Sequence, residues 1–321
     1  MSRADEHVTW KQRLAYRTYR AGEWLAAALP EPVGRRVFAT LGRLAHRVLP
    51  NVRATVRANQ ARVHGFANDD PRLELATREA FDLYARYWID TFRLPTLPHE
   101  AVNARTRFVG AENIDRALEL GKGVICVIPH MGNWDVAGAW LGINGYPIWA
   151  VAEVLEPRPL FELFRRNREA MGMKIVALEK DGHVGTQLKR LLSENQLIAL
   201  VSDRDLTGRG VEVEMFGAPR KVPAGPALLS ITSGAPLLMC SSYTLDDGYE
   251  VRIGAPIEAE RTGELRRDVE ALSRAMADGF ERAIAARPTD WHLFQPGWDD
   301  GSSAARPTPR ASTQADGSRP A

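Results

Sequence analysis

Cysteine and metal-ligand patterns are scarce in this 321-residue sequence. Only two cysteines are present, Cys126 and Cys240, and each lies inside an apolar run. Two isolated cysteines exclude a disulfide framework and cannot build a zinc site, and the seven histidines lack ligand spacing. We therefore expect two buried free thiols in a reducing compartment and no metal centre.

Long apolar segments are also absent. No window of about 18 uncharged apolar residues occurs, so no segment is expected to span a bilayer. The N-terminus lacks the apolar stretch of a secretory signal. The hydrophobic fraction of 45% nevertheless excludes a globally disordered chain. The sequence therefore predicts a protein of the cytosol or of the cytosolic face of a membrane.

The length and the C-terminal composition indicate one domain followed by a tail. A chain of this length can bury the core of a single α/β domain, which we place at residues 1–300. After Gly297 the sequence consists mainly of Gly, Ser, Ala, Pro, Thr, Arg and Asp without a hydrophobic pattern. Residues 301–321 are therefore expected to form a disordered tail.

Positive charge is concentrated near the N-terminus. Residues 1–63 contain 12 Arg and Lys against four acidic residues, a net charge of +8, whereas the whole chain carries only +2. Apolar and aromatic residues recur there at helical spacing, which predicts two amphipathic helices separated at Pro30 and Pro32. Basic amphipathic helices can lie in a membrane interface. Helices packed on the domain with a solvated basic face are the alternative, and no motif supports nucleic-acid binding.

From residue 105 onward, strands and helices are predicted to alternate. The apolar run 124–128 is typical of a buried parallel strand, and the helix expected at 71–94 carries an aromatic stripe that indicates core. This alternation predicts an α/β fold with a central, mostly parallel sheet that has helices on both faces. The residue ranges 208–210 and 216–221 are expected to be loops around the site. Further strands are predicted at 147–151, 174–178, 196–202, 237–242 and 250–253, and further helices at 133–143, 158–171, 182–193, 226–233 and 265–287.

The chemistry is expected where the strand 124–128 ends, at His130. Ligands of open α/β sheets gather at the carboxyl ends of the strands. Asp135 follows five positions later, near the start of the next helix, and can accept a hydrogen bond from the imidazole. Such a bond fixes the tautomer and leaves the other ring nitrogen free to take a proton. A helix-capping aspartate beside a structural histidine is the alternative.

A protein nucleophile is missing from the sequence. There is no Gly-x-Ser-x-Gly elbow, and neither cysteine has a reactive context. His130 with an aspartate then favours a substrate hydroxyl that is deprotonated as it attacks a thioester, without an acyl-enzyme. A thioester hydrolase and a non-catalytic lipid-binding module are the other possibilities.

The segment His130-Met131-Gly132-Asn133-Trp134-Asp135 resembles the His-x₄-Asp block of bacterial lysophospholipid acyltransferases, in the branch of the lipid A late acyltransferases. The resemblance covers about residues 80–300 and is greatest to actinobacterial phosphatidylinositol mannoside acyltransferases. It implies transfer of palmitoyl from acyl-CoA, a substrate and not a cofactor, to a mannose hydroxyl of these glycolipids. A lipid A-type enzyme that uses acyl carrier protein is the alternative. The blocks that carry the resemblance are His130–Asp135, Glu153, Arg165–Arg168, Asp203–Asp205, Phe216–Pro219 and Asp290–Pro296.

The same resemblance implies roles for individual residues. Asp203, which follows the strand 196–202, is expected near His130, where it would bind the acceptor sugar or help protons move; an ion pair with Arg204 is the alternative. The arginines that follow the strand at 147–151 suit phosphates, because a guanidinium offers two parallel donors, although a solvated helix face explains them too. Trp291 and His292 are expected to be core residues. The catalytic candidates are His130, Asp135 and Asp203, and the substrate-binding candidates are Glu153, Arg165, Arg168, Arg204 and Asp205.

Overall fold

The computed structural model describes residues 9–179, 183–205 and 208–298. The tail predicted at residues 301–321 lies outside the described residues. A seven-stranded sheet forms the centre of the fold, in the order β1-β9-β8-β2-β5-β3-β4. Every neighbouring pair in it is parallel except β8 and β9, so the predicted mostly parallel sheet is confirmed. Its strands are β1 (Thr106–Val109), β2 (Val124–Ile128), β3 (Ile148–Glu153), β4 (Lys174–Leu178), β5 (Leu197–Val201), β8 (Leu237–Thr244) and β9 (Tyr249–Pro256).

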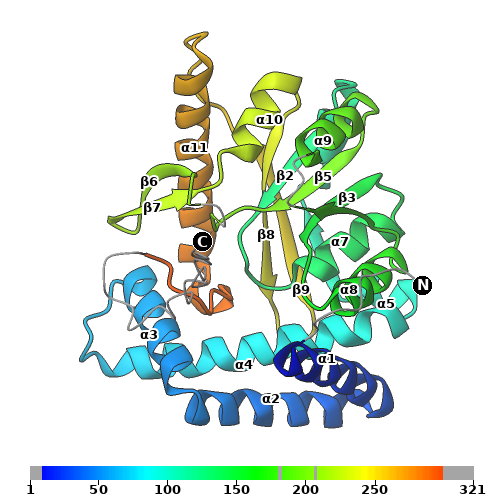
Figure 1. The fold of residues 1–321 in the computed structure, drawn as a ribbon, viewed down its shortest axis with the longest axis vertical. Coiled ribbons are helices and arrows are strands. Elements are labelled where there is room, and N and C mark those ends of the chain that lie inside the picture. Colours follow the sequence, from blue (N-terminus) through cyan, green and yellow to red (C-terminus); the bar gives the residue numbers. More distant parts are fainter. Residues whose placement is uncertain (1–8, 180–182, 206–207, 299–321) are drawn as a thin grey trace, which may run out of the picture.

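Eleven α-helices within the described residues surround this sheet (Figure 1). The predicted helices are all present, with ends shifted by a few residues. The helices are α1 (Trp10–Ala28), α2 (Glu31–Val48), α3 (Pro50–His64), α4 (Pro71–Arg93), α5 (His99–Ala104), α6 (Ala111–Glu119), α7 (Trp134–Ile143), α8 (Arg158–Glu169), α9 (Val184–Ser193), α10 (Gly225–Ser233) and α11 (Leu265–Ala286), with short 3₁₀ turns η2 (Leu94–Thr96) and η3 (Pro288–Asp290).

The alternation of side chains along β2 explains why both faces of the sheet are covered. Successive residues of a strand point to opposite faces. Ile125 and Val127 join one core cluster with α9, α10 and α11, whereas Val124, Cys126 and Ile128 join another with α5, α6 and α7. All five side chains are buried. A continuous apolar run is therefore the correct pattern for this central strand.

One part of the loop prediction is wrong. Two short strands, β6 (Val211–Met215) and β7 (Ala218–Val222), pair as an antiparallel hairpin outside the main sheet. The turn between them contains Phe216 and Gly217, both with positive φ. Polar and charged residues alternate with Val213, Met215 and Val222, which pack into the core. The glutamates of β6 alternate with its apolar residues, and the predicted loop at 216–221 covers the turn and most of β7.

The aromatic stripe of α4 is core, as predicted. Phe81, Tyr87, Ile89 and Phe92 are buried, and α1, α2 and α4 lie side by side across the end of the sheet at which β8 finishes (Figure 1). No helix within the described residues has the length and apolarity that crossing a bilayer requires.

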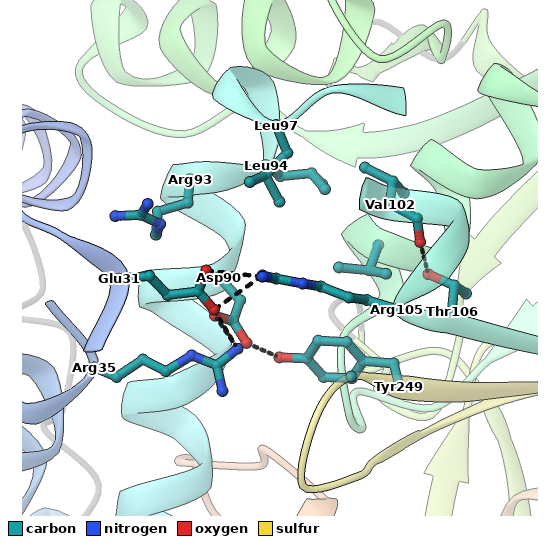
Figure 2. A pocket seen from close by; sticks show the side chains of 12 residues that line it. Glu31, Arg35, Asp90, Arg93, Leu94, Leu97, Val102, Arg105, Thr106 and Tyr249 are labelled. Carbon is teal, nitrogen blue, oxygen red and sulfur yellow. Dashed lines mark hydrogen bonds and ion pairs between the residues drawn. The ribbon is translucent and has the colours of Figure 1, made fainter. Parts of the chain in front are cut away.

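A polar network attaches these N-terminal helices to the sheet (Figure 2). Arg105, just before β1, donates two hydrogen bonds of 2.9 and 3.0 Å to Glu31 of α2. Arg35 lies 3.5 Å from the carboxylate of Asp90, which also accepts a 2.7 Å bond from the hydroxyl of Tyr249. Burial raises the pKa of Tyr249, so this hydroxyl remains a donor to Asp90. Helix α2 is thus joined to the start of β1 and to α4, and α4 is joined to β9, by directed polar contacts.

Candidate active site

Strand register brings His130 and Asp203 together. β2 and β5 are parallel neighbours, and Ile128 pairs with Val201. His130 and Asp203 each lie two residues beyond these partners, so the register carries both side chains to the same edge of the sheet. The Nδ1 atom of His130 lies 2.5 Å from Oδ1 of Asp203. The His130 side chain is 24% exposed, whereas Asp203 is completely buried.

Asp203 is held as a carboxylate. Burial alone would raise its pKa, but the charge and hydrogen bond of His130, the positive charge of Arg220 and a hydrogen bond from Trp291 together lower the pKa well below its ordinary value. The indole Nε1 of Trp291 donates to Oδ2 at 2.7 Å, and Arg220 donates to the backbone carbonyl of Asp203 at 2.6 Å. Since an ionised carboxylate only accepts, Nδ1 of His130 carries the hydrogen and Nε2 is left as the acceptor.

The structure does not pair Asp135 with His130, so this part of the sequence prediction is wrong. Asn133 is the N-cap of α7, and Asp135 is already the second residue of the helix. Its buried carboxylate accepts a 2.6 Å bond from Arg168 of α8 and a 3.0 Å bond from the hydroxyl of Tyr87 of α4. Asp135 therefore joins α7 to two neighbouring helices, and Asp203 takes the place at the imidazole.

The turn after His130 requires a glycine. Gly132 has φ = +57°, and a Cβ atom at this position would lie 2.1 Å from the carbonyl oxygen of Ser242. The side chain of Asn133 then caps α7 by accepting from the backbone N–H of Val136 at 3.0 Å. The tight turn and the cap that follows it hold His130 between the end of β2 and the start of α7 with little freedom to move.

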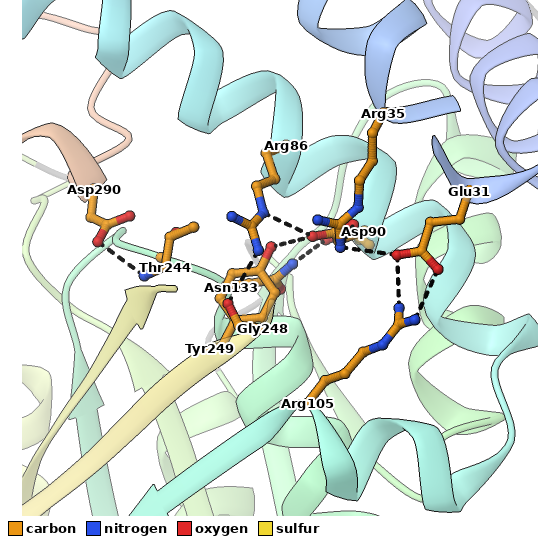
Figure 3. Close-up of polar contacts among 12 residues, drawn as sticks. Glu31, Arg35, Arg86, Asp90, Arg105, Asn133, Thr244, Gly248, Tyr249 and Asp290 are labelled. Atoms are coloured by element: carbon orange, nitrogen blue, oxygen red, sulfur yellow. Dashed lines mark hydrogen bonds and ion pairs between the residues drawn. The ribbon is translucent and has the colours of Figure 1, made fainter. Parts of the chain in front are cut away.

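A C-terminal segment holds this turn in place. The backbone N–H of Gly132 donates to the carbonyl of Asp290 at 2.9 Å, and that of His292 donates to the carbonyl of His130 at 2.6 Å. Asp290 is itself anchored to the end of β8, where its carboxylate accepts from the backbone N–H of Thr244 at 3.0 Å (Figure 3). Trp291 and His292 are buried, which confirms that they belong to the core. Their contacts with Asp203 and the His130 turn were not predicted, because no sequence pattern tells which buried group an indole or imidazole meets.

The burial of His292 leads us to expect that the folded protein loses stability in acid. The pKa of His292 is lowered from 6.5 to about 3, mainly by burial; the 2.9 Å hydrogen bond with the carbonyl of Gly132 raises this pKa, and the charge of His130 lowers it. Below about pH 6.5 the unfolded chain binds a proton that the folded protein rejects, so stability falls as the pH falls. The free energy of unfolding is expected to fall by up to about 1.4 kcal/mol for each pH unit because of this one group. His292→Gln, which keeps a donor for Gly132, is expected to remove this component from urea-unfolding free energies measured between pH 7.5 and 4.5. If the free energy of unfolding depended on pH in the same way in the wild type and in His292→Gln, His292 would not be the cause.

The remaining predicted residues divide between the sheet edge and the surface. Glu153, at the end of β3, and Arg204, after Asp203, form an ion pair of 3.8 Å at the same edge, so the alternative pairing of Arg204 with Asp203 is not observed. Asp205 accepts a 2.7 Å bond from the backbone N–H of Gly210, just before β6. Arg165 is 42% exposed and pairs with Glu162 and Glu169 of its own helix.

Arg168 is not free for a phosphate in the way that the sequence suggested. Its guanidinium binds Asp135 through two hydrogen bonds of 2.6 and 3.3 Å. Only 21% of the side chain is exposed. Tyr87, which completes this cluster, was predicted only as a member of the aromatic stripe, since the helical pattern does not tell where its hydroxyl points.

Comparison with known proteins gives consistent matches over most of the chain. The family model described as bacterial lipid A biosynthesis acyltransferase matches residues 4–300. The chain is 36% identical over 281 residues to the phosphatidylinositol mannoside acyltransferase of Mycolicibacterium smegmatis, an alignment that covers 87% of this chain and 90% of that protein. It is 37% identical over 287 residues to the phosphatidylinositol mannoside acyltransferase of Mycobacterium tuberculosis, which covers 87% of each chain. The family match includes all of the site residues described above.

Proposed function

The chain belongs to the bacterial lipid A biosynthesis acyltransferase family and is an acyltransferase, and we propose that it transfers a long-chain acyl group from acyl-CoA to a mannose hydroxyl of phosphatidylinositol mannosides. Palmitoyl is the expected acyl chain. The names of two mycobacterial relatives support this acceptor. The observation that carries the mechanism is the contact of 2.5 Å between His130 Nδ1 and Asp203 Oδ1 at the edge of the sheet.

In the proposed reaction His130 is the general base. Its Nε2 takes the proton of the mannose hydroxyl as the hydroxyl oxygen attacks the thioester carbonyl carbon. The tetrahedral intermediate collapses, the carbon–sulfur bond breaks, and the imidazolium returns the proton to the departing thiolate of coenzyme A. Asp203 stabilises the imidazolium while it exists. The products are the ester and free coenzyme A, and no acyl-enzyme forms. Both cysteines are buried in the core, which supports direct transfer.

Groups at the same edge are proposed to bind the substrates. Glu153 is 54% exposed on its side chain and is placed to accept hydrogen bonds from sugar hydroxyls. Arg204 offers a guanidinium beside it for a phosphate. Arg165 on α8 is an exposed candidate for the phosphates of coenzyme A, because its present partners are replaceable surface glutamates. Asp205 is proposed to act indirectly, by holding the backbone of Gly210 just before β6.

The direct test is a mass-spectrometric assay with separate donors and acceptors. The protein is incubated with palmitoyl-CoA or palmitoylated acyl carrier protein, and with a phosphatidylinositol mannoside or a lipid A precursor. We expect an acylated mannoside from palmitoyl-CoA. Preference for acyl carrier protein and the lipid A precursor would support the lipid A-type alternative. Release of palmitate in place of transfer would indicate a hydrolase, and lipid binding without turnover would indicate a binding module.

The acceptor resides in a membrane, and we propose that α2 docks the protein on the cytosolic face. One face of this helix, with Phe38 and Gly42, packs on α4. The adjoining face exposes an apolar stripe at helical spacing, which is not covered within the described residues. Exposed arginines on the same helix provide attraction to anionic headgroups. The stripe consists of Val33, Leu41, Leu44 and Val48, which are 43–59% exposed, and the arginines are Arg36, Arg43 and Arg47.

Removing this stripe is expected to weaken vesicle binding. The double substitution Leu41→Gln/Leu44→Gln should lower the affinity for phosphatidylinositol-containing vesicles by about tenfold or more, because each buried leucine contributes roughly 1.5–3 kcal/mol. Cosedimentation at two salt concentrations measures this. Leu265→Gln on α11 is the matched control, since Leu265 is 50% exposed outside the stripe. Equal binding by wild type and the double variant would exclude docking through α2.

A further inference from the structure

We propose that Trp291 is a positioning residue for the acyl transfer: its indole N–H fixes the Asp203 carboxylate in the orientation that steers His130. This inference rests on the proposed role of His130 as general base. The two oxygens of Asp203 have different partners. Oδ1 lies 2.5 Å from His130 Nδ1, and Oδ2 accepts from Trp291 Nε1 at 2.7 Å. With both oxygens engaged, rotation of the carboxylate would break one hydrogen bond or the other.

The indole is itself held firmly. Trp291 is 1% exposed, and its backbone forms an antiparallel bridge to Met131, the residue after the base. Its ring packs edge-on against Trp298 at 5.9 Å, and the guanidinium of Arg220 lies 5.2 Å from the ring centroid. The same guanidinium group donates to the Asp203 backbone. These contacts restrict the rotamer of Trp291 and therefore the direction of its N–H bond.

One short segment thus controls both partners of the site. Trp291 binds Asp203, and the next residue, His292, donates from its backbone N–H to the carbonyl of His130 at 2.6 Å. A segment that only closed the core would need apolar contacts but no donor aimed at Oδ2. The arrangement of Trp291 and His292 fixes the separation of His130 from Asp203, on which the short Nδ1–Oδ1 contact depends.

Loss of the indole N–H has a definite electrostatic consequence. Oδ2 would be left in a buried place without its donor, and the pKa of Asp203 would rise, because this bond is one of the interactions that lower it. A carboxylate with one donor fewer is a stronger acceptor for the imidazolium of His130. His130 would then keep its proton to higher pH. Among the other charged or titratable groups of the described residues, Arg220 interacts with Asp203 and His292 interacts with His130, while Arg204 lies beside Arg220.

Trp298 provides a matched control. It is also buried, at 4% exposure, and it also packs beside the Arg220 guanidinium at 5.2 Å. Its indole nitrogen, unlike that of Trp291, has no hydrogen-bond partner among the described residues. Trp298→Phe therefore removes a similar volume from the same cluster and leaves the donor to Asp203 in place.

The experiment compares Trp291→Phe with Trp298→Phe in the full chain, with palmitoyl-CoA and a phosphatidylinositol mannoside as substrates. Trp291→Phe is expected to lower kcat by about 10- to 100-fold, the range for a hydrogen bond to a charged group, with little change in KM. The acidic limb of its kcat–pH profile should move to higher pH, by about one unit. Trp298→Phe should lose stability but keep the wild-type profile. A ¹⁵N spectrum of the His130 side chain during a pH titration reports the same change without turnover.

Three outcomes would overturn the proposal: a wild-type profile for Trp291→Phe, equal shifts in both variants, or an unchanged His130 titration. If Trp291→Phe does not fold, benzothienylalanine at position 291 keeps the bicyclic ring and replaces the N–H by sulfur. His130→Asn separates this proposal from the proposed function. An active His130→Asn variant removes the assigned base, whereas an inactive one together with a normal Trp291→Phe variant removes only the positioning role.

Discussion

Replacing His130 with asparagine is expected to lower the rate of acyl transfer by about 10²- to 10⁴-fold, the usual contribution of a general base. The amide nitrogen of asparagine can occupy nearly the position of Nδ1 and donate to Asp203, so the buried carboxylate keeps a partner. An amide has no basic nitrogen, however, and cannot accept the proton of the acceptor hydroxyl. The variant should therefore fold normally and fail in the chemical step, with kcat reduced much more than KM is changed.

The measurement is the initial rate of mannoside acylation at saturating palmitoyl-CoA, with thermal unfolding recorded in parallel. His99→Asn is the control, because His99 begins α5 on the exposed surface, away from the sheet edge. It should retain wild-type activity. A His130→Asn variant that keeps more than about a tenth of the wild-type rate would show that another group takes the proton.

The position of His130 could be predicted from the sequence because its signals are local. A solid apolar run identifies the central strand, and the strand end and following helix place the histidine at the functional edge of the sheet. The other predicted helices and strands were found for the same reason, since a helical period or an apolar run is visible within one segment, whereas α5, α6 and β1 were not predicted. The hairpin β6–β7 was missed although β6 alternates apolar residues with glutamates, because Phe216, Gly217 and Pro219 indicate a loop over the turn and the start of β7.

The partner of His130 could not be ranked correctly, because that choice depends on which strands are neighbours. Asp135 is five residues away in sequence and Asp203 is 73. Sequence proximity favoured Asp135, yet the helix begins at Trp134 and directs the Asp135 side chain to Tyr87 and Arg168. Asp203 reaches the imidazole only because β5 lies beside β2 in register. The contact of Trp291 with Asp203 likewise depends on how the C-terminal segment returns to the sheet.

Asp203→Asn and Asp135→Asn are expected to separate catalysis from stability. In Asp203→Asn the amide oxygen can accept from the Trp291 indole, which turns the amide NH₂ toward Nδ1 of His130. The imidazole must then carry its hydrogen on Nε2, the nitrogen that has to accept the substrate proton. Transfer should fall by about 10²- to 10⁴-fold, as expected when a base is held in the wrong tautomer. The free energy of unfolding should change by no more than about 2 kcal/mol.

Asp135→Asn should show the opposite pattern. The substitution leaves Arg168 without its charged partner in a site where only 21% of its side chain is exposed. Breaking a buried ion pair from one side costs roughly 3–5 kcal/mol, and the partial exposure of Arg168 favours the lower end. Urea unfolding should reveal this loss, while the rate per folded molecule, measured at low temperature, should stay within a few-fold of wild type.

The pair Asp135→Asn/Arg168→Met tests the cause of that loss. Removing both charges avoids an unpaired guanidinium, so the double variant should be more stable than the sum of the two single variants predicts. The comparison with Asp203→Asn then decides between the two aspartates. If Asp135→Asn lost transfer at normal stability and Asp203→Asn kept it, Asp135 would be the group that orients His130, and the contact between Nδ1 and Asp203 would have no catalytic role. The geometry predicts the reverse, because Asp135 already gives its oxygens to Arg168 and Tyr87 and Asp203 gives one of its own to the imidazole.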